Sequence, residues 1–458
     1  MRAAYDSYMS SSNSVCSSSV VPSARVVSFE DARHLVEQQA AGVCSGEAET
    51  VDLPAGLGRV LAEGILADRD FPPFARATRD GYAVRAADLA KVPARLDVVG
   101  EVKAGDWPEA GMCSVGPGQA VGIMTGAPLP AGADAVVMVE HTSLLADQFP
   151  GSPAGKVEVR RSVSVGENFV PRGAEARAGQ LLLDRGRRLD HAGMAIAASV
   201  GKSRVQVFRK PRVAVLSTGD EVIEIDATPG PAEIRNSNSY SLAAQVQNAG
   251  GEAVRLTIAP DERKPLRALI EEGFGCDLLL LTGGVSMGKY DLVEQVLSEL
   301  KAEFYFIGAE IQPGRPVVFG SCSAGALARA DGGSAVGTRA RAPALHKKYF
   351  FGLPGNPVST MVTFELFARP MVEALAGMTP QPLIFLRARL KSEIRTKTGL
   401  KRFLPAVLSG EFENAEVELA RWQGSGDIAA LARANCYVVV PPDREQIDAG
   451  EWVSLLMR

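Results

Sequence analysis

The sequence predicts a multidomain protein that combines an α/β domain with β-rich domains. Its 458 residues are too many for one hydrophobic core, so about three domains are expected. Between residues 211 and 375, buried strand patterns alternate with helical patterns, which indicates a three-layer α/β domain with a mostly parallel sheet. The regions on both sides show short β-type runs, so we expect β-rich N-terminal domains and a small C-terminal β-barrel or sandwich domain.

The composition is that of an ordinary globular protein. A net charge of -4 gives no overall attraction to nucleic acid or to an anionic membrane, so neither is expected as a partner. No apolar run approaches the roughly 20 residues that cross a bilayer. The cysteines form no Cys-x-x-Cys pair, which predicts reduced thiols in a cytoplasmic protein and disfavours a zinc site; they are Cys16, Cys44, Cys113, Cys276, Cys322 and Cys436.

The N-terminal part begins with a serine-rich segment, residues 1–27, that we expect to be a disordered tail because it lacks a continuous hydrophobic core. Ser28 is a helix N-cap candidate and Asp31 follows three residues later, so a first helix is predicted near 29–42. From about 51 to 185 the pattern is β-type with long loops, and a helix is predicted at about 188–200.

The central part repeats the order strand, polar loop, helix. PRVAVLSTGDEV, EAVRLTIAPDE and CDLLLLTGGVSMG are each predicted to be a strand running into a loop, followed by the helices NSNSYSLAAQVQNAG, RKPLRALIEEGF and DLVEQVLSELKA. FYFIGAEIQPGRPVVFG predicts paired short strands, and YFFGLPGNPVSTMVTFELFARP predicts a strand, a turn and a helix. Residues 381–458 return to β-type alternation. The loops of such a sheet meet at the carboxyl ends of its strands, where ligands bind.

One of these loops comes within a residue of a nucleotide-binding signature. Gly283, Gly288 and Lys289 fit Gly-x-x-x-x-Gly-Lys-[Ser/Thr], but Tyr290 stands where a small hydroxyl should bind magnesium. A true P-loop is therefore disfavoured. A glycine loop that binds phosphate through backbone N–H groups and a helix N-terminus fits better, and a plain turn into a helix is the structural alternative.

Acidic residues are predicted at the same edge of the sheet. Asp220, Glu221, Asp261 and Asp291 lie in these loops, and carboxylates beside a phosphate repel it unless a hard cation such as Mg²⁺ lies between them. Each has a structural alternative: Asp291 can cap its helix, and Asp220 and Glu221 can be solvated loop charges. Asn356 can likewise serve only as an asparagine turn before a proline.

Six motifs together resemble one family. RDGYAVR, GIMTGAPLPAGADAVVMVE, VAVLSTGDEV, LTGGVSMGKYD, PGRPVVFG and LPGNPVS stand in the order and approximate spacing of the MoeA family, which includes the gephyrin E domain. The resemblance covers about residues 28–458. It implies a molybdopterin molybdotransferase that inserts molybdate into adenylylated molybdopterin with Mg²⁺-dependent release of AMP. It also implies a homodimer, with a molybdopterin adenylyltransferase and molybdoenzymes as partners.

The resemblance divides the chain into parts. Residues 28–205 match the N-terminal region, with a β-rich domain inserted at about 66–165. Residues 208–375 match the molybdopterin-binding α/β domain, and residues 376–458 match a small C-terminal β-barrel domain.

The resemblance also implies site residues. Asp80 and Thr125 lie in motifs that complete the site across a dimer interface, and Glu221, Asp261 and Asp291 match acidic positions with a metal-binding role. The ligand-binding positions implied by the motifs are Gly283, Gly284, Ser286, Arg315, Pro354, Gly355, Asn356, Ser359, Arg402 and Ser425.

Three features depart from the family pattern. Arg315 stands where many relatives have lysine, which keeps the charge but changes its shape. Gln312 replaces a lysine of some bacterial members and leaves one fewer cation for an oxyanion such as molybdate. Residues 321–348 form a longer connection than usual, predicted to be a flexible surface loop.

Two other functions remain open on the sequence. The central domain resembles enzymes that adenylylate molybdopterin from ATP, although such enzymes usually consist of that domain alone. A scaffold or binding role with the same fold is the second alternative, against which the intact acidic loops argue. The sequence does not decide between molybdate and tungstate, nor which molybdoenzymes are served.

Overall fold

The computed structural model describes residues 26–43, 46–107, 114–145, 155–284, 292–323, 347–379 and 381–458. The chain divides into two compact units, Glu47–Phe208 and a unit that joins Met1–Gly46 to Arg209–Arg458. Almost all of the predicted serine-rich tail and most of the 321–348 connection lie outside the described residues.

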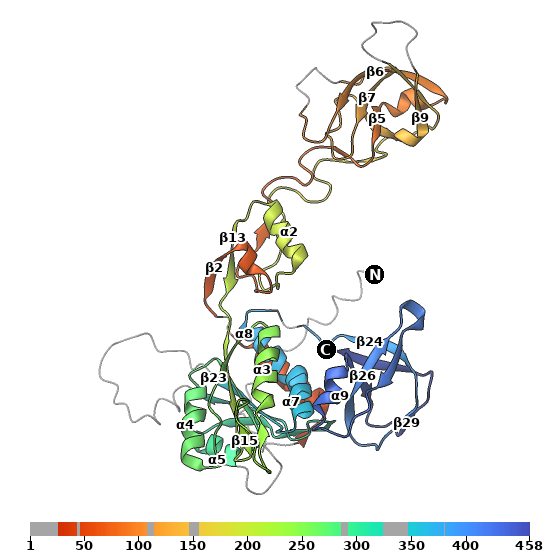
Figure 1. The fold of residues 1–458 in the computed structure, drawn as a ribbon. Coiled ribbons are helices and arrows are strands. Elements are labelled where there is room, and N and C mark those ends of the chain that lie inside the picture. The colour runs from red at the N-terminus through yellow and green to blue at the C-terminus, as the bar shows by residue number, and fades with distance from the viewer. Residues whose placement is uncertain are drawn as a thin grey trace, which may run out of the picture. The chain divides into compact units, whose positions relative to one another are not determined.

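The Glu47–Phe208 unit is β-rich, as predicted (Figure 1). Its main sheet has six strands in the order β8-β5-β7-β6-β10-β9. Its elements are β2 (Ala48–Asp52), η1 (Leu53–Gly56), β3 (Ile65–Leu66), β4 (Arg76–Ala77), β5 (Gly81–Val84), η2 (Ala86–Leu89), β6 (Ala94–Val102), β7 (Gln119–Ile123), β8 (Ala135–Met138), η3 (Val139–His141), β9 (Thr142–Leu145), β10 (Lys156–Val159), β11 (Phe169–Val170), β12 (Leu181–Leu183), α2 (His191–Ser199) and β13 (Arg204–Phe208).

Strands β5, β7 and β8 of this sheet are buried on both faces because nearly all of their residues are apolar. Successive side chains of a strand point to opposite faces. Tyr82 and Val84 of β5 accordingly belong to one hydrophobic cluster, and Ala83 between them belongs to another. A third cluster packs α2 against β13.

The second unit contains the central α/β domain. Its helices are α1 (Phe29–Ala41), α3 (Ser237–Asn248), α4 (Arg263–Gly273), α5 (Leu292–Glu299), α7 (Pro357–Thr363), the π-helical turn η4 (Phe364–Ala368) and α8 (Arg369–Leu375). Its strands are β1 (Val26–Val27), β14 (Arg212–Ser217), β15 (Val222–Ile223), β16 (Ile234–Arg235), β17 (Glu252–Arg255), β18 (Leu278–Thr282), β19 (Glu303–Phe306), β20 (Gly308–Ala309), β21 (Ile311–Gln312), β22 (Val318–Ser323) and β23 (Lys347–Leu353).

The central sheet has the order β17-β14-β18-β23-β22-β19. The first four strands are parallel to one another, while β22 pairs antiparallel with both β23 and β19. One hydrophobic cluster packs α1, α3, α7 and α8 on one face, and a second packs α4 and α5 on the other (Figure 1). The predicted three-layer α/β domain with a mostly parallel sheet is therefore confirmed.

The first helix begins where its capping residues place it. Ser28 Oγ accepts a hydrogen bond from the backbone N–H of Asp31 at 3.0 Å and donates to the Asp31 carboxylate at 2.8 Å. The first bond gives a partner to one backbone N–H that the first turn leaves without a helical partner, and the second joins the two side chains.

The C-terminal residues form a closed barrel of five strands, β26-β27-β24-β30-β28, which closes through the pairing of β26 with β28. Of the predicted barrel or sandwich, the barrel is confirmed. Strand β21 extends the sheet at β26. The elements are β24 (Phe385–Leu390), β25 (Ile394–Arg395), β26 (Lys401–Ser409), η5 (Phe412–Asn414), β27 (Glu416–Leu419), α9 (Ile428–Arg433), β28 (Cys436–Val440), β29 (Gln446–Ile447) and β30 (Trp452–Met457).

Three of the cysteines lie in the described part of the chain, and all three are free and buried. Burial raises the pKa of Cys322 to about 12 and that of Cys436 to about 11. These thiols stay protonated and unreactive at neutral pH. In the described residues, no helix is both long enough and apolar enough to cross a membrane.

Candidate functional site

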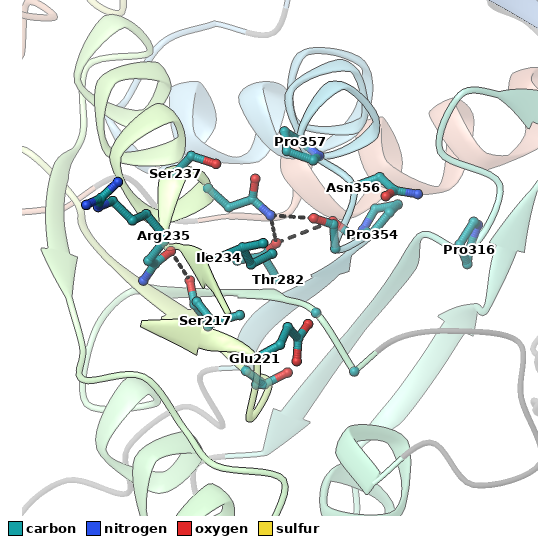
Figure 2. A pocket seen from close by; sticks show the side chains of 17 residues that line it. Ser217, Glu221, Ile234, Arg235, Ser237, Thr282, Pro316, Pro354, Asn356 and Pro357 are labelled. Carbon is teal, nitrogen blue, oxygen red and sulfur yellow. Dashed lines mark hydrogen bonds between the residues drawn. The ribbon is translucent and has the colours of Figure 1, made fainter. Parts of the chain in front are cut away.

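A cleft of about 400 Å³ opens at the carboxyl ends of the parallel strands β14, β18 and β23 (Figure 2). This is the edge where the sequence predicts ligand binding. The residues that line the cleft are Ser217, Thr218, Glu221, Val222, Ile234, Arg235, Asn236, Ser237, Asn238, Thr282, Gly283, Gly284, Pro316, Pro354, Gly355, Asn356 and Pro357. Three of the four predicted loops, STGDE, TGG and LPGN, thus meet at one cleft.

Gly283 follows β18 and lies against the loop after β14. Its φ of +92° is a conformation that other residues rarely adopt, and a Cβ at this position would lie 2.4 Å from the Thr218 carbonyl oxygen. Gly355 packs on the other side, since a Cβ there would approach the Gly283 Cα to 3.5 Å. The two glycine loops are therefore neighbours, and Gly283 has no room for a side chain, whereas a Cβ at Gly355 would be in ordinary van der Waals contact.

The start of α3 forms another wall of the cleft. Asn236 is the N-cap of α3, and its Oδ1 accepts hydrogen bonds from the Ser217 hydroxyl at 2.9 Å and from the Ser239 N–H at 3.2 Å. In the sequence, NSNSYS predicts only a capped helix. The signal for a second role is the run of Asn and Ser directly after a short strand, at the edge of the sheet where the other loops end.

The charges of the cleft are few. Among its described lining residues, Arg235 is the only cationic side chain and Glu221 the only anionic one. Arg235 is exposed, and its Nε donates to the Ala227 carbonyl at 3.2 Å. Within the described residues, an anionic ligand in this cleft would therefore meet one guanidinium, one carboxylate and polar groups. Lys347 and Lys348 do not line the cleft; the former pairs with Glu303 at 3.2 Å and the latter donates to the Cys276 carbonyl at 2.7 Å.

Two further predicted carboxylates lie next to Glu221. The backbone N–H of Asp261 donates to Asp220 Oδ1 at 3.0 Å, which ties the APDE loop to the STGDE loop. The pKa of Asp261 is raised by partial burial and further by the negative charges of Asp220 and Glu221. No three His, Cys, Asp or Glu side chains among the described residues converge into a ready-made metal site.

This arrangement suits a divalent cation that keeps part of its water shell. Mg²⁺ is usually held by one or two carboxylates together with substrate phosphates, not by an all-protein cage. The mutual repulsion that raises the Asp261 pKa is relieved when a cation binds between the carboxylates. Glu221 and Asp261 are thus suitable Mg²⁺ ligands, and Asp291, the third predicted ligand, lies outside the described residues.

A second cavity, of about 240 Å³, lies between β21 and the C-terminal barrel and is lined by Gln312 and Arg402 among others. Arg402 is only 6% exposed. Its Nη2 donates to the Lys397 carbonyl at 2.6 Å and its Nε to the Thr396 hydroxyl, but its Nη1 has no hydrogen-bond partner. Burial lowers the pKa of Arg402. A buried guanidinium with an unpaired N–H group and no carboxylate partner is a suitable oxyanion-binding group.

The remaining predicted residues fall in several places. Ser359 is buried inside α7, where its carbonyl accepts from the Thr363 hydroxyl at 2.8 Å. The Ser425 carbonyl accepts from the Val358 N–H at 3.0 Å, which joins the barrel to the start of α7. Arg315 is exposed and lines neither cavity.

Asp80 and Thr125 belong to the Glu47–Phe208 unit and lie together there. The Thr125 N–H donates to Asp80 Oδ1 at 2.6 Å. Ser286 and the signature residues Gly288, Lys289 and Tyr290 are outside the described part of the chain. The choice between a phosphate loop and a plain turn therefore rests on Gly283 and Gly284, which do line the cleft.

Comparison with known sequence families covers most of the chain. Residues 27–201 match the MoeA N-terminal region (domain I and II), residues 214–374 a probable molybdopterin binding domain, and residues 387–457 the MoeA C-terminal region (domain IV). All the residues that line the first cleft fall within the second of these matches.

Curated relatives and solved structures agree with these matches. A protein of Bacillus subtilis named molybdopterin molybdenumtransferase is 32% identical over 418 residues, which is 90% of each chain. One of Staphylococcus aureus with the same name is 32% identical over 432 residues, 93% of this chain and 94% of its own. A crystal structure of the molybdopterin biosynthesis MoeA protein from Pyrococcus horikoshii has a TM-score of 0.70 at 27% identity, covering 95% of this chain and all of that chain.

Proposed function

Because the chain belongs to the MoeA family, we propose that it is a molybdopterin molybdenumtransferase of molybdenum cofactor biosynthesis. The observation that carries this proposal is the cleft at the carboxyl ends of β14, β18 and β23. It lies at the ligand-binding edge of the sheet and is formed by the glycine loops whose motifs resemble those of the family.

Adenylylated molybdopterin is the proposed substrate of this cleft. The cleft volume of about 400 Å³ falls within the range of small-molecule sites. Gly283 and Gly355 bring backbone rather than side chains to its floor, which suits a phosphate group that binds to N–H groups. Arg235 supplies a positive charge at one side, and the hydroxyl and amide groups of Ser217, Asn236 and Asn238 supply polar contacts.

Mg²⁺ is the proposed cofactor, with Glu221, Asp261 and Asp291 as candidate ligands. When bound, it would offset the charge on the phosphates as AMP leaves. The chain's own acidic groups then have one task, which is to hold the cation beside the glycine loop. The protein need not supply thiols, because the pterin carries the sulfur atoms that bind the metal. This agrees with the buried, protonated state of the cysteines in the described ranges.

Molybdate is the proposed second substrate, and the cavity at Arg402 is its proposed binding site. The unpaired Nη1 of Arg402 can donate to an oxyanion in that cavity. Gln312 lines the same cavity and offers a neutral amide where some relatives have a lysine. The oxyanion would meet the buried guanidinium of Arg402 beside an exposed ion pair of Arg395 and Glu393, 3.0 Å apart, which also lines the cavity.

A homodimer is proposed on the family resemblance, with Asp80 and Thr125 completing the active site of the partner subunit. Their hydrogen bond fixes the Asp80 carboxylate on the surface of the Glu47–Phe208 unit, where it is exposed. An exposed carboxylate held in one orientation is suited to contact a ligand or a cation that another subunit binds. A molybdopterin adenylyltransferase and molybdoenzymes remain proposed protein partners.

The transferase is distinguished from an adenylyltransferase by the substrate that it consumes. We expect the purified protein to release AMP from adenylylated molybdopterin when Mg²⁺ and molybdate are present. We expect no adenylylated pterin from ATP and molybdopterin. Formation of the adenylylated pterin from ATP would replace the proposed reaction, and inactivity in both assays would favour a scaffold role.

A further inference from the structure

The side-chain amide of Asn238 connects three segments that are far apart in the sequence. Asn238 stands in the first turn of α3, and its Nδ2 donates to the Thr282 hydroxyl at 2.9 Å and to the Gly355 carbonyl at 2.7 Å. Thr282 is the last residue of β18, directly before Gly283. One amide group thus reaches both glycine loops of the cleft, and its bond to the labelled Thr282 is among the dashed lines in Figure 2.

The orientation of this amide is fixed by its partners. The Gly355 carbonyl can only accept a hydrogen bond, so the NH₂ group of Asn238 must face it. The Thr282 hydroxyl then accepts from Asn238 and donates onward to the Pro354 carbonyl at 3.3 Å. Asn238 Oδ1 is left buried without a partner. Neither a carboxylate nor an apolar side chain could replace the two donated bonds.

We propose that Asn238 is a positioning residue that fixes the distance between the two glycine loops, and through it the geometry in which the cleft holds the phosphate and pterin parts of its ligand. This inference rests on the proposed function and specifies how the same cleft works. Gly283 and Gly355 both line the cleft and lie close enough that a Cβ on Gly355 would be 3.5 Å from the Gly283 Cα, so a shift of either loop changes the shape of the cleft. Misplacement by about 1 Å can cost roughly 10²-fold in rate.

The same helix offers a matched control. Gln245 lies seven residues further along α3, two turns away on the same side. Its Nε2 donates to the Met361 carbonyl at 3.0 Å and to Glu365, and its Oε1 is buried without a partner, just as Oδ1 of Asn238 is. Gln245 does not line the cleft. The two residues thus make similar ties from α3 to the segment after β23, one at the cleft and one away from it.

The test compares Asn238→Ala with Gln245→Ala. We expect both to lower Tm by similar amounts. Only Asn238→Ala should lower kcat/KM for AMP release by roughly 10²-fold, mostly through kcat, because it misplaces reacting groups. Thr282→Val keeps the shape but removes both the bond from Asn238 and the bond that the hydroxyl donates to the Pro354 carbonyl. It should also lower kcat/KM, and it serves if Asn238→Ala does not fold.

A second readout does not depend on activity. Hydrogen exchange of the backbone amides of residues 282–284, 353, 355 and 356 should be faster in Asn238→Ala than in wild type, and unchanged in Gln245→Ala. Equal exchange in both variants, or equal losses of kcat/KM, would overturn the role of Asn238. If the wild type releases no AMP, the proposed function fails, whereas the exchange measurement still tests whether Asn238 holds the loops.

Discussion

The backbone N–H of Thr125 donates a hydrogen bond to Asp80 Oδ1 at 2.6 Å, across 45 residues of sequence. This bond joins the motifs RDGYAVR and GIMTGAPLPAGADAVV, which are predicted separately from the sequence. The hydrogen bond from the Thr125 N–H is the main cause of a lowered pKa of Asp80, and a bond from the Thr125 hydroxyl lowers this pKa further. Asp80 therefore stays ionised to lower pH than an ordinary aspartate.

Thr125→Val should raise the pKa of Asp80 only in part, because the backbone N–H remains. A depressed folded-state pKa contributes stability above the unfolded pKa of about 3.9 that is lost as pH falls through the folded value. The variant should therefore lose this contribution at a higher pH than wild type does. Titration of the Asp80 carboxyl by NMR in both proteins measures this change in pKa. The same Asp80 pKa in the variant as in wild type would mean that the backbone N–H alone lowers it.

Gly283→Ala should disable the cleft. The residue would be strained at φ +92°, at a cost of about 1–3 kcal/mol, and its Cβ would also meet the Thr218 carbonyl oxygen at 2.4 Å. Gly399→Ala is the matched control, because Gly399 has a φ of +99° and open space around it. In denaturant unfolding, Gly283→Ala should lose more stability than Gly399→Ala. In the AMP-release assay, only Gly283→Ala should lose activity. Equal losses in the two variants would show that the contact with Thr218 is unimportant.

Asp261→Asn should raise stability while lowering activity. The raised pKa of Asp261 means that the folded state disfavours its ionised form, so this cost is absent at low pH and grows as pH rises through the unfolded and then the folded pKa. At pH 7 in metal-free buffer, the variant should have a higher Tm than wild type. Addition of Mg²⁺ should raise the Tm of wild type by more than it raises the Tm of the variant. Asp226→Asn, at an exposed loop position, should change neither the Tm in metal-free buffer nor the rise in Tm that Mg²⁺ causes. Identical Tm responses to Mg²⁺ in wild type and Asp261→Asn would remove Asp261 from the metal site.

Much of the fold could be predicted because its strands are apolar on both faces. The short apolar run Leu278–Thr282, followed by glycines, is typical of a buried strand in a sheet covered on both sides, and the polar loops that follow parallel strands of this kind share an edge. The capping pair Ser28 and Asp31 likewise specified the start of α1. These features are local or periodic, so they can be read from the sequence.

The rest depends on contacts between distant segments. Nothing beside Asn238 in the sequence indicates that its amide reaches Thr282 and Gly355, 44 and 117 residues away. The unpaired Nη1 of Arg402 is also invisible in the sequence, because it depends on which groups the barrel brings near it. The proposed domain boundaries at about 66, 165 and 205 stay predictions.

Arg402→Met should weaken molybdate binding without unfolding the barrel. Exchanging a buried charge that lacks an acidic partner for an apolar side chain should leave stability within roughly 1 kcal/mol of wild type, or above it. Loss of a charge-assisted hydrogen bond should weaken molybdate binding by about tenfold or more. Arg387→Met, at an exposed position of β24, is the control and should bind molybdate normally. Titration calorimetry with molybdate measures both, and wild-type affinity in Arg402→Met would place the oxyanion elsewhere.

The most direct test counts AMP released against molybdenum incorporated, using adenylylated molybdopterin at limiting Mg²⁺ with wild type and with Asp291→Asn. Asparagine caps a helix about as well as aspartate, so a capping role predicts near-normal turnover in the variant. A metal-binding role predicts that the variant folds and binds the pterin but loses turnover by orders of magnitude. We expect wild type to release one AMP for each molybdenum incorporated, and Asp291→Asn to release almost none. Release of AMP without molybdenum incorporation, or none from wild type, would contradict the proposed function, and near-normal turnover in the variant would return Asp291 to a capping role.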